Sequence, residues 1–450
     1  MVAVITSWFA WLLCLMTGLI LLWADRESEL QWISPLKWFG IAFLVLHLIM
    51  PFNILFFKDS LDLKFDSSEY FLMCIASVLG GISFWFGWRL KRCIAIRPII
   101  IPEKHIGSRN QRLIQMLLLF PISVIALIVL SHAFGSLLAF AIVPFEAYDL
   151  IGPDFYNIFS FILASFVPFT ILAMAQFQDT RSIQRVWWAV AATLLFLMYF
   201  LIAMKLGSRF RLLFIILPIF AMFCSTRKIR ANSWPMLLFG CCGILFYVFG
   251  RIRHHLVLLP GDFLNKITEY FSASSRSLYF DIFMSGDFDA FQNGMHLLSI
   301  VPYSKPLMWG ATFFSVIYNP IPRFLWAGKP APSINQYLID EGLGPASVGH
   351  YNFAVSLIAE LYANFWWIGV ILGMFLFGMI AAYMWNWFLS NRNRYEAWFH
   401  IALFCAYTLM VTRGSFHSMT VYYLMIAICE FLTRKIAWIV VPAPNSKNQK

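Results

Sequence analysis

The chain has 450 residues, of which 61% are hydrophobic and only 12% are charged, and its mean hydropathy is +0.74. A soluble domain carries about 25% charged residues, so this composition excludes an ordinary soluble enzyme. The net charge of +11 does not indicate a nucleic-acid partner. The sequence contains no nucleic-acid-binding module, and in a membrane protein basic residues report topology and contacts with lipid head groups.

Apolar runs of about 20 residues, the length that crosses the hydrocarbon core of a bilayer, recur along the whole chain. They predict an all-α, polytopic membrane protein, since a transmembrane barrel would need alternating segments of about ten residues. The first run has no basic region before it and no cleavage site after it, so we expect a retained span rather than a signal peptide. The eleven expected spans are residues 2–23, 36–57, 70–88, 113–134, 155–177, 186–206, 211–225, 234–250, 365–388, 397–412 and 417–433.

The positions of lysine and arginine predict the orientation of these spans. With the N-terminus outside, the cytoplasmic segments hold 20 of the 33 basic residues and the short external segments hold six. Short cytoplasmic loops are enriched in Lys and Arg, whereas long loops count little. The chain is thus expected to have eight spans in 1–250, a large external loop with short amphipathic helices in 251–364, and three spans with a cytoplasmic tail in 365–450. The orientation of the first two spans rests on few charges.

Arginines in short external segments are the first candidate functional residues. Arg209 begins a span in KLGSRFR, where a turn can expose a helix N-terminus that suits a phosphate. Arg211 lies about 200° around the same helix, so we expect its side chain to snorkel towards lipid head groups; snorkelling is also the alternative for Arg209. Arg413 occupies a short external turn in TRGSFHS, where the topology rule disfavours a basic residue that has no function. Arg251 and Arg253 end a span, where they either anchor the interface or contact a substrate.

A polar stripe precedes the ninth expected span. Its members, Asn352, Ser356, Glu360 and Asn364, recur every four residues and therefore share one face of a helix. Glu360 has two compatible interpretations: an ion pair with an arginine, or a carboxylate that accepts a proton from a hydroxyl nucleophile.

The segment NPIPRFLWAGKP, residues 319–330, cannot cross a bilayer as a regular helix because its three prolines each remove a helix hydrogen bond. We expect it to be a rigid, basic and aromatic part of the external loop. No cofactor and no metal ion are expected, because the cysteines and histidines show no metal-ligand spacing and no nucleotide-binding loop is present.

Four stretches of this chain resemble the Wzy-type O-antigen polymerases, which polymerise oligosaccharide repeat units in the bacterial inner membrane. They are GSR (207–209), IPRFLWAGKP (321–330), SLIAELYANFWWIGVILG (356–373) and RGSF (413–416). Their order, spacing and shared external side carry the resemblance, which covers about residues 200–420. One departure concerns the helix after Asn-Phe, where family members often have glycine and this chain has Trp366.

The resemblance implies a GT-C-like helical fold and a metal-independent glycosyl transfer at the periplasmic face. The donor and the acceptor would both be oligosaccharides linked to undecaprenyl diphosphate, and a chain-length regulator would be a further partner besides the lipid bilayer. The catalytic residues would be Glu360 as base and Arg209 and Arg413 as cations for the diphosphate, which arginine binds through two parallel hydrogen bonds. The substrate-binding candidates are Arg323, Lys329, Trp326, Phe324, Arg251, Arg253 and Arg276.

Two other functions share part of this pattern. An O-antigen ligase would have the same donor and a similar basic loop, but a different acceptor. A transporter or flippase for lipid-linked sugars would be expected to have internal repeats and helices broken near the middle of the membrane, and the sequence indicates neither.

Overall fold

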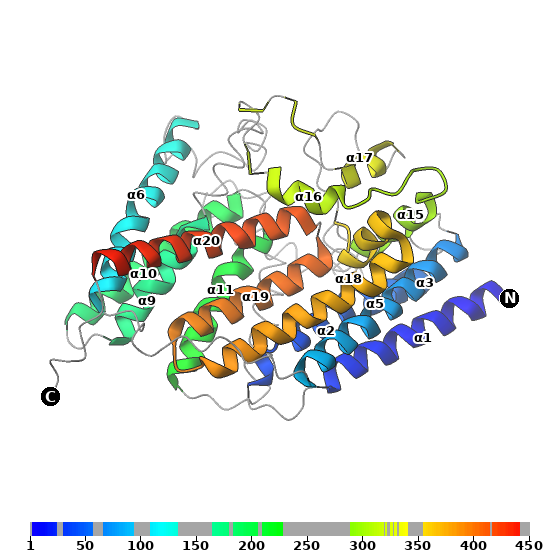
Figure 1. Ribbon diagram of the computed structural model, residues 1–450, viewed down its shortest axis with the longest axis horizontal. Helices are drawn as coiled ribbons and strands as arrows, with labels where there is room; N and C mark the ends of the chain where they lie inside the picture. Colours follow the sequence, from blue (N-terminus) through cyan, green and yellow to red (C-terminus); the bar gives the residue numbers. More distant parts are fainter. Residues whose placement is uncertain are drawn as a thin grey trace, which may run out of the picture.

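Every regular element among the described residues of the computed structural model is a helix (Figure 1). The structure describes residues 2–24, 30–56, 66–93, 109–133, 164–179, 183–205, 209–227, 289–318, 320–321, 325–326, 328–330, 333–340, 354–414 and 416–441. The helices before the large loop are α1 (Val2–Trp23), α2 (Pro35–Leu44), α3 (Met50–Phe56), α5 (Ser67–Cys93), α6 (Arg109–Ala133), α9 (Phe166–Asp179), α10 (Ile183–Lys205) and α11 (Arg209–Arg227). A π-helical turn, Val45–Ile49, joins α2 to α3, and Gln31–Ile33 is a 3-10 turn.

Three short helices and three long ones follow. They are α15 (Ala290–Ile300), α16 (Ala311–Tyr318), α17 (Ser333–Asp340), α18 (Leu357–Ser390), α19 (Tyr395–Arg413) and α20 (Phe416–Val440). The all-α class predicted from the sequence is confirmed for the described residues. Helices lie at every expected span except 234–250, which is outside the described residues together with the first part of 155–177.

Four stretches of the described residues are long and apolar enough to cross a membrane. They are Ile5–Trp23, Pro35–Phe56, Ser67–Leu90 and Leu357–Ser390, and shorter apolar helices lie at Asn110–Ile125, Phe166–Phe177, Gln184–Phe200 and Arg211–Ser225. Several apolar helices are thus observed, while the number of eleven spans and the extent of the large loop stay predictions.

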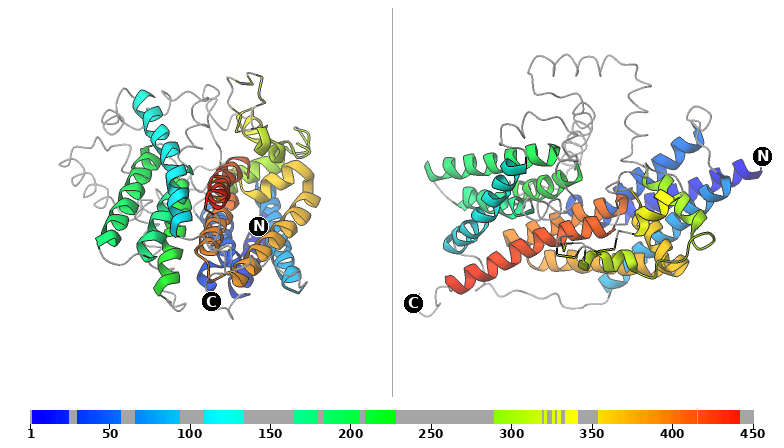
Figure 2. Two further views of the ribbon diagram at one scale, coloured as in Figure 1. Left: turned by 60° about the vertical axis from the view of Figure 1, so that its left-hand side comes forward. Right: turned by 90° about the horizontal axis from the view of Figure 1, so that it is seen from above.

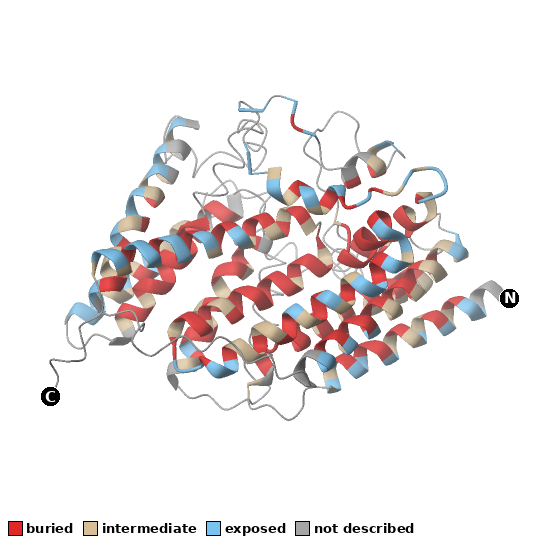
Figure 3. Cartoon of the chain, in the orientation of Figure 1, coloured by how far each residue is buried: buried red, intermediate tan, exposed pale blue. Residues whose placement is uncertain are grey.

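Helix α19 lies at the centre of the bundle. It packs between α11 and α2 and also contacts α18 and α20. Figure 2 shows that α9, α10 and α6 form one side of the molecule and α1, α2 and α5 the other, with α15, α16 and α17 near the starts of α18 and α20. Buried and exposed residues alternate along the same helices, with apolar side chains on both faces (Figure 3).

Helices α5 and α18 make the most extensive packing contact, and small residues allow it. A Cβ atom on Gly87 would overlap the carbonyl oxygen of Phe375, and a Cβ atom on Gly378 would overlap that of Phe84. Small residues at such crossings let helix backbones touch, which is a common way to join helices in membranes. This contact holds the part of α18 around Gly378 against α5.

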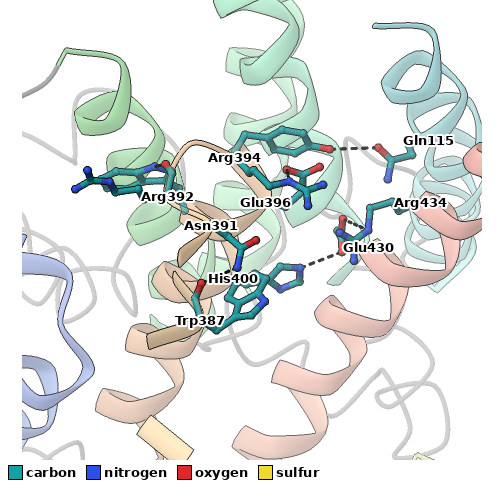
Figure 4. A network of polar contacts seen from close by, with 11 residues as sticks. Gln115, Trp387, Asn391, Arg392, Arg394, Glu396, His400, Glu430 and Arg434 are labelled. Atoms are coloured by element: carbon teal, nitrogen blue, oxygen red, sulfur yellow. Dashed lines mark hydrogen bonds and ion pairs between the residues drawn. The ribbon is translucent and has the colours of Figure 1, made fainter. Parts of the chain in front are cut away.

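One end of the bundle holds a charged network, mostly buried, where α18 turns into α19 (Figure 4). The Arg394 guanidinium lies 3.6 Å from the carboxylate of Glu396. The Glu430 carboxylate joins His400 at 3.2 Å and Arg434 at 3.3 Å. We name these five residues the charged network. It ties α19 to α20 at the end that the sequence predicts to be cytoplasmic.

Candidate functional site

Glu360 lies in the first turns of α18, at the opposite end of that helix from the charged network, and its side chain is fully buried. The helix begins there because Ser356 adopts an extended conformation and its hydroxyl accepts a hydrogen bond from the Ala359 N–H at 3.3 Å, a typical N-cap. Glu360 Oε2 accepts a hydrogen bond of 2.7 Å from the N–H of Phe416. Phe416 is the first residue of α20, so the carboxylate lies at a helix N-terminus, where negative charge is favourable.

Helix α18 is broken just after this turn. Phe365 has φ −138° and ψ 18°, and Trp366 has φ 56° and ψ −148°, so residues 357–364 form a short helix separate from the rest. The break lies at the start of the predicted span 365–388 and not near the middle of the membrane. The positive φ of Trp366 is the conformation that glycine adopts without strain.

A turn from the large loop satisfies the carbonyl groups that the break leaves without helix partners. The N–H of Met308 donates to Ala363 O at 3.0 Å, and the N–H of Trp309 donates to Asn364 O at 3.2 Å. Trp309 and Gly310 both have positive φ, 47° and 85°. Carbonyls at a helix end otherwise lack partners, so this turn, residues 308–310, stabilises the break.

Asn364 connects that turn to Glu360. Its side chain is fully buried, and its Oδ1 accepts a hydrogen bond from the Gly310 N–H at 2.9 Å. Its Nδ2 donates to Thr312 Oγ1 at 2.8 Å and to the carbonyl oxygen of Glu360 at 2.7 Å. The buried Thr312 side chain also lies beside the Glu360 carboxylate, to which its hydroxyl can donate a hydrogen bond.

Aromatic side chains close the site on the loop side. The Phe313 ring lies 4.6 Å from the Phe416 ring and 6.1 Å from the Phe365 ring, with which it stacks. Within the described part of the chain, Glu360 Oε1 has no hydrogen-bond partner and is not accessible to water. One carboxylate oxygen is thus held by a backbone N–H, and the other is buried without a hydrogen bond among the described residues.

The three arginines that the sequence groups together are only partly described. Arg413 is the last residue of α19, half-buried, three residues before the Phe416 that binds Glu360. Arg209 is the first residue of α11, but its side chain lies outside the described residues, and so does the whole of Arg323. The convergence of Arg209, Arg323 and Arg413 on one cavity stays a prediction.

Arg211 does not snorkel, and this expectation is wrong. Its side chain is 2% exposed, and its guanidinium lies over the ring of Tyr422 in α20 at 5.3 Å from the ring centre. Tyr199 of α10 donates a hydrogen bond to the Arg211 carbonyl at 2.7 Å and bonds the Tyr422 hydroxyl at 2.7 Å. The side chain of Arg211 therefore faces the bundle interior, and its separation from the Arg209 side chain stays a prediction.

Two candidates from the large loop are described. Lys329 is buried and donates a hydrogen bond to the carbonyl of Ile321 at 2.9 Å, which closes its own loop. Trp326 is 41% exposed, and its ring meets that of Tyr318 edge to face at 5.9 Å. A role in substrate binding stays a prediction for both. The other candidates, Phe324, Arg251, Arg253 and Arg276, lie outside the described residues.

Sequence reasoning missed Gly310 and Thr312. The Trp-Gly pair before an apolar stretch indicates a turn and then a helix, but nothing in the pattern connects this turn with residue 364. Among the described residues no group of three His, Cys, Asp or Glu side chains is placed to hold a metal ion.

A buried carboxylate in which one oxygen has no hydrogen bond can accept a proton from a hydroxyl group that reaches it. Removal of water strengthens its interaction with any charge that develops nearby. The arrangement thus suits a transfer reaction with a hydroxyl nucleophile at one end of a helical bundle.

A family model described as O-antigen polysaccharide polymerase Wzy matches residues 112–437, which include Glu360, Asn364, Thr312 and Arg413. No curated protein matches the chain. No solved structure matches it either.

Proposed function

Since the chain belongs to the Wzy family of O-antigen polysaccharide polymerases, we propose that it polymerises oligosaccharide repeat units linked to undecaprenyl diphosphate at the periplasmic face of the inner membrane. The observation that carries the proposal is the buried Glu360 carboxylate beside the first turn of α20, within the matched residues.

The reaction follows from the chemistry of that carboxylate. A hydroxyl oxygen at the non-reducing end of the acceptor repeat unit attacks the anomeric carbon of the donor chain. Its proton passes to Glu360 Oε1, the oxygen without a well-formed hydrogen bond in the described residues. The bond between the anomeric carbon and the diphosphate oxygen breaks, and undecaprenyl diphosphate leaves with the bonding electron pair.

Arginines stabilise the leaving group in this proposal. A diphosphate gains negative charge as it departs, and preorganised cations at the place where charge develops are usually the largest single contribution to catalysis. Arg413 is the supporting observation, because it ends α19 close in sequence to Phe416, whose N–H binds Glu360. Arg209 and Arg323 complete the proposed set.

Deletion of the gene tests the proposed function. The surface polysaccharide of the deletion strain is separated on a gel beside that of the same strain with the gene restored. Loss of the ladder with one repeat unit retained on the lipid-A core supports the polymerase. Bare core without any repeat unit would instead identify a ligase, and accumulation of unflipped lipid-linked units would identify a transporter.

A further inference from the structure

The hydroxyl group of Thr312 has its direction set by its partners. Asn364 Nδ2 donates to Thr312 Oγ1 at 2.8 Å, so the hydroxyl accepts this bond and its own proton is left to donate. The Glu360 carboxylate lies beside this hydroxyl as an acceptor for that proton. An ionised carboxylate only accepts hydrogen bonds, which makes the pair complementary.

The orientation of the Asn364 amide is also determined by its surroundings. Its Oδ1 faces the Gly310 N–H, and its Nδ2 faces the carbonyl oxygen of Glu360 and the hydroxyl of Thr312. Exchanging the oxygen and the nitrogen of the amide would bring two donors together at Gly310 and two acceptors together at Glu360. The network therefore permits one orientation.

From these contacts we infer that Asn364 and Thr312 are positioning residues for Glu360, an inference that rests on the proposed function. Asn364 orients the Thr312 hydroxyl, and this hydroxyl and the Phe416 N–H hold the carboxylate in one position, in which Oε1 is the oxygen without a hydrogen bond among the described residues. Neither residue touches the substrate. The turn at residues 308–310 belongs to the same unit, because it binds Asn364 at the break in α18.

Two substitutions at position 312 separate positioning from packing. Thr312→Val keeps the shape and removes the hydroxyl, and Thr312→Ser keeps the hydroxyl. Thr408→Val is the matched control: Thr408 is equally buried, and its hydroxyl donates only to the Phe404 carbonyl of its own helix. Each variant restores the gene in the deletion strain, and polymer formed per unit time is divided by the amount of chain in the membrane.

A hydrogen bond to a charged group is typically worth about ten-fold to a hundred-fold in an equilibrium or a rate. We expect Thr312→Val to lose about ten-fold or more of the rate, while Thr312→Ser keeps more than about half and Thr408→Val stays near wild type. A rate for Thr312→Val within about two-fold of wild type, or equal losses in the serine and valine variants, would overturn the inference.

A second variant decides the matter if Thr312→Val does not accumulate. Asn364→Asp keeps the acceptor for the Gly310 N–H but removes the donor to Thr312. Asn391→Asp is its control, since Asn391 is also buried and donates to a carbonyl of its own helix, that of Trp387. Loss of rate in Asn364→Asp alone supports the inference, and equal rates overturn it. If the deletion strain still makes its full ladder, the proposed function fails instead.

Discussion

At the scale of the residue, the Glu360 carboxylate can act in two ways: it binds the start of α20, and it can accept a proton. Its Oε2 accepts the first N–H of α20, which is a stabilising contact in itself. A carboxylate that only held two helices together would be replaceable by an amide, because an amide oxygen accepts the same bond. Catalysis makes a different demand, since only a carboxylate accepts a proton at neutral pH.

Glu360→Gln is therefore expected to fold and to lose activity. General-base assistance contributes about 10²–10⁴-fold to a rate, and the polymer ladder, corrected for the amount of chain, should fall by that order. Glu396→Gln is the control, because Glu396 is a buried carboxylate of the charged network that pairs with Arg394. It should lower the unfolding temperature in detergent and leave the rate per folded molecule unchanged. A full ladder from Glu360→Gln would remove Glu360 from catalysis.

Arg211 leads to a prediction about stability. A cation over a desolvated aromatic ring contributes about 2 kcal/mol, against about 0.5–1 kcal/mol at an exposed site. Arg211→Ala should thus lower the free energy of unfolding clearly more than Arg89→Ala, whose guanidinium lies 5.0 Å from the Trp85 ring centre but is exposed. Denaturation of both purified variants measures the difference. Equal losses of unfolding free energy in the two variants would show that the Arg211 side chain is as exposed as that of Arg89.

The sequence predicts some of these residues because their chemistry is local. The four-residue spacing of Ser356, Glu360 and Asn364 places them on one helical face, and all three are buried in the structure. It does not predict that Arg211 points inward, because the ring that receives it, Tyr422, is about 200 positions away. Pairings of this kind depend on the fold and not on local pattern.

At the scale of the element, hydropathy predicts the span in α18 but not the break within that helix. A run of about 20 apolar residues predicts a span, and Leu357–Ser390 qualifies as one. The break at Phe365 and Trp366 leaves no local signal, since both residues occur readily inside helices. Its stabilising hydrogen bonds come from Met308 and Trp309, more than 50 positions earlier.

At position 366 the break predicts that a glycine variant is more stable than an alanine variant, the reverse of the order inside a regular helix. A non-glycine residue in such a conformation costs about 1–3 kcal/mol, so Trp366→Gly should be more stable than Trp366→Ala by about 1 kcal/mol. Both variants lose the same indole, including its hydrogen bond to the Tyr362 hydroxyl. At the neighbouring Trp367, which is helical, alanine should be the more stable by about 1 kcal/mol.

Thermal unfolding of the four purified variants in one detergent measures these differences. Because each comparison is between glycine and alanine at one position, the loss of the aromatic side chain cancels. The same order at both positions would show that residue 366 is ordinary helix in the folded protein.

At the scale of the whole molecule, the Glu360 site and the charged network lie at opposite ends of the bundle. The charged network joins α19 to α20 at one end, where Tyr395 also donates a hydrogen bond to Gln115 of α6 at 3.5 Å (Figure 4). The Glu360 site lies at the other end, where α18, α20 and the turn at residues 308–310 meet. Hydropathy and charge counts predict this separation in outline, because they assign each helix end to a side. They do not predict the contacts made there.

Labelling of single cysteines tests which end faces the periplasm. Tyr303, 75% exposed near the Glu360 site, and Asn393, exposed beside the charged network, are each replaced by cysteine. Because 20 of 33 basic residues lie in the segments assigned to the cytoplasm, Tyr303→Cys should react with a membrane-impermeant thiol reagent added to intact cells. Asn393→Cys should react only after the inner membrane is opened. The unsubstituted protein gives the background from its own cysteines, and reaction of Asn393→Cys with Tyr303→Cys protected would reverse the orientation.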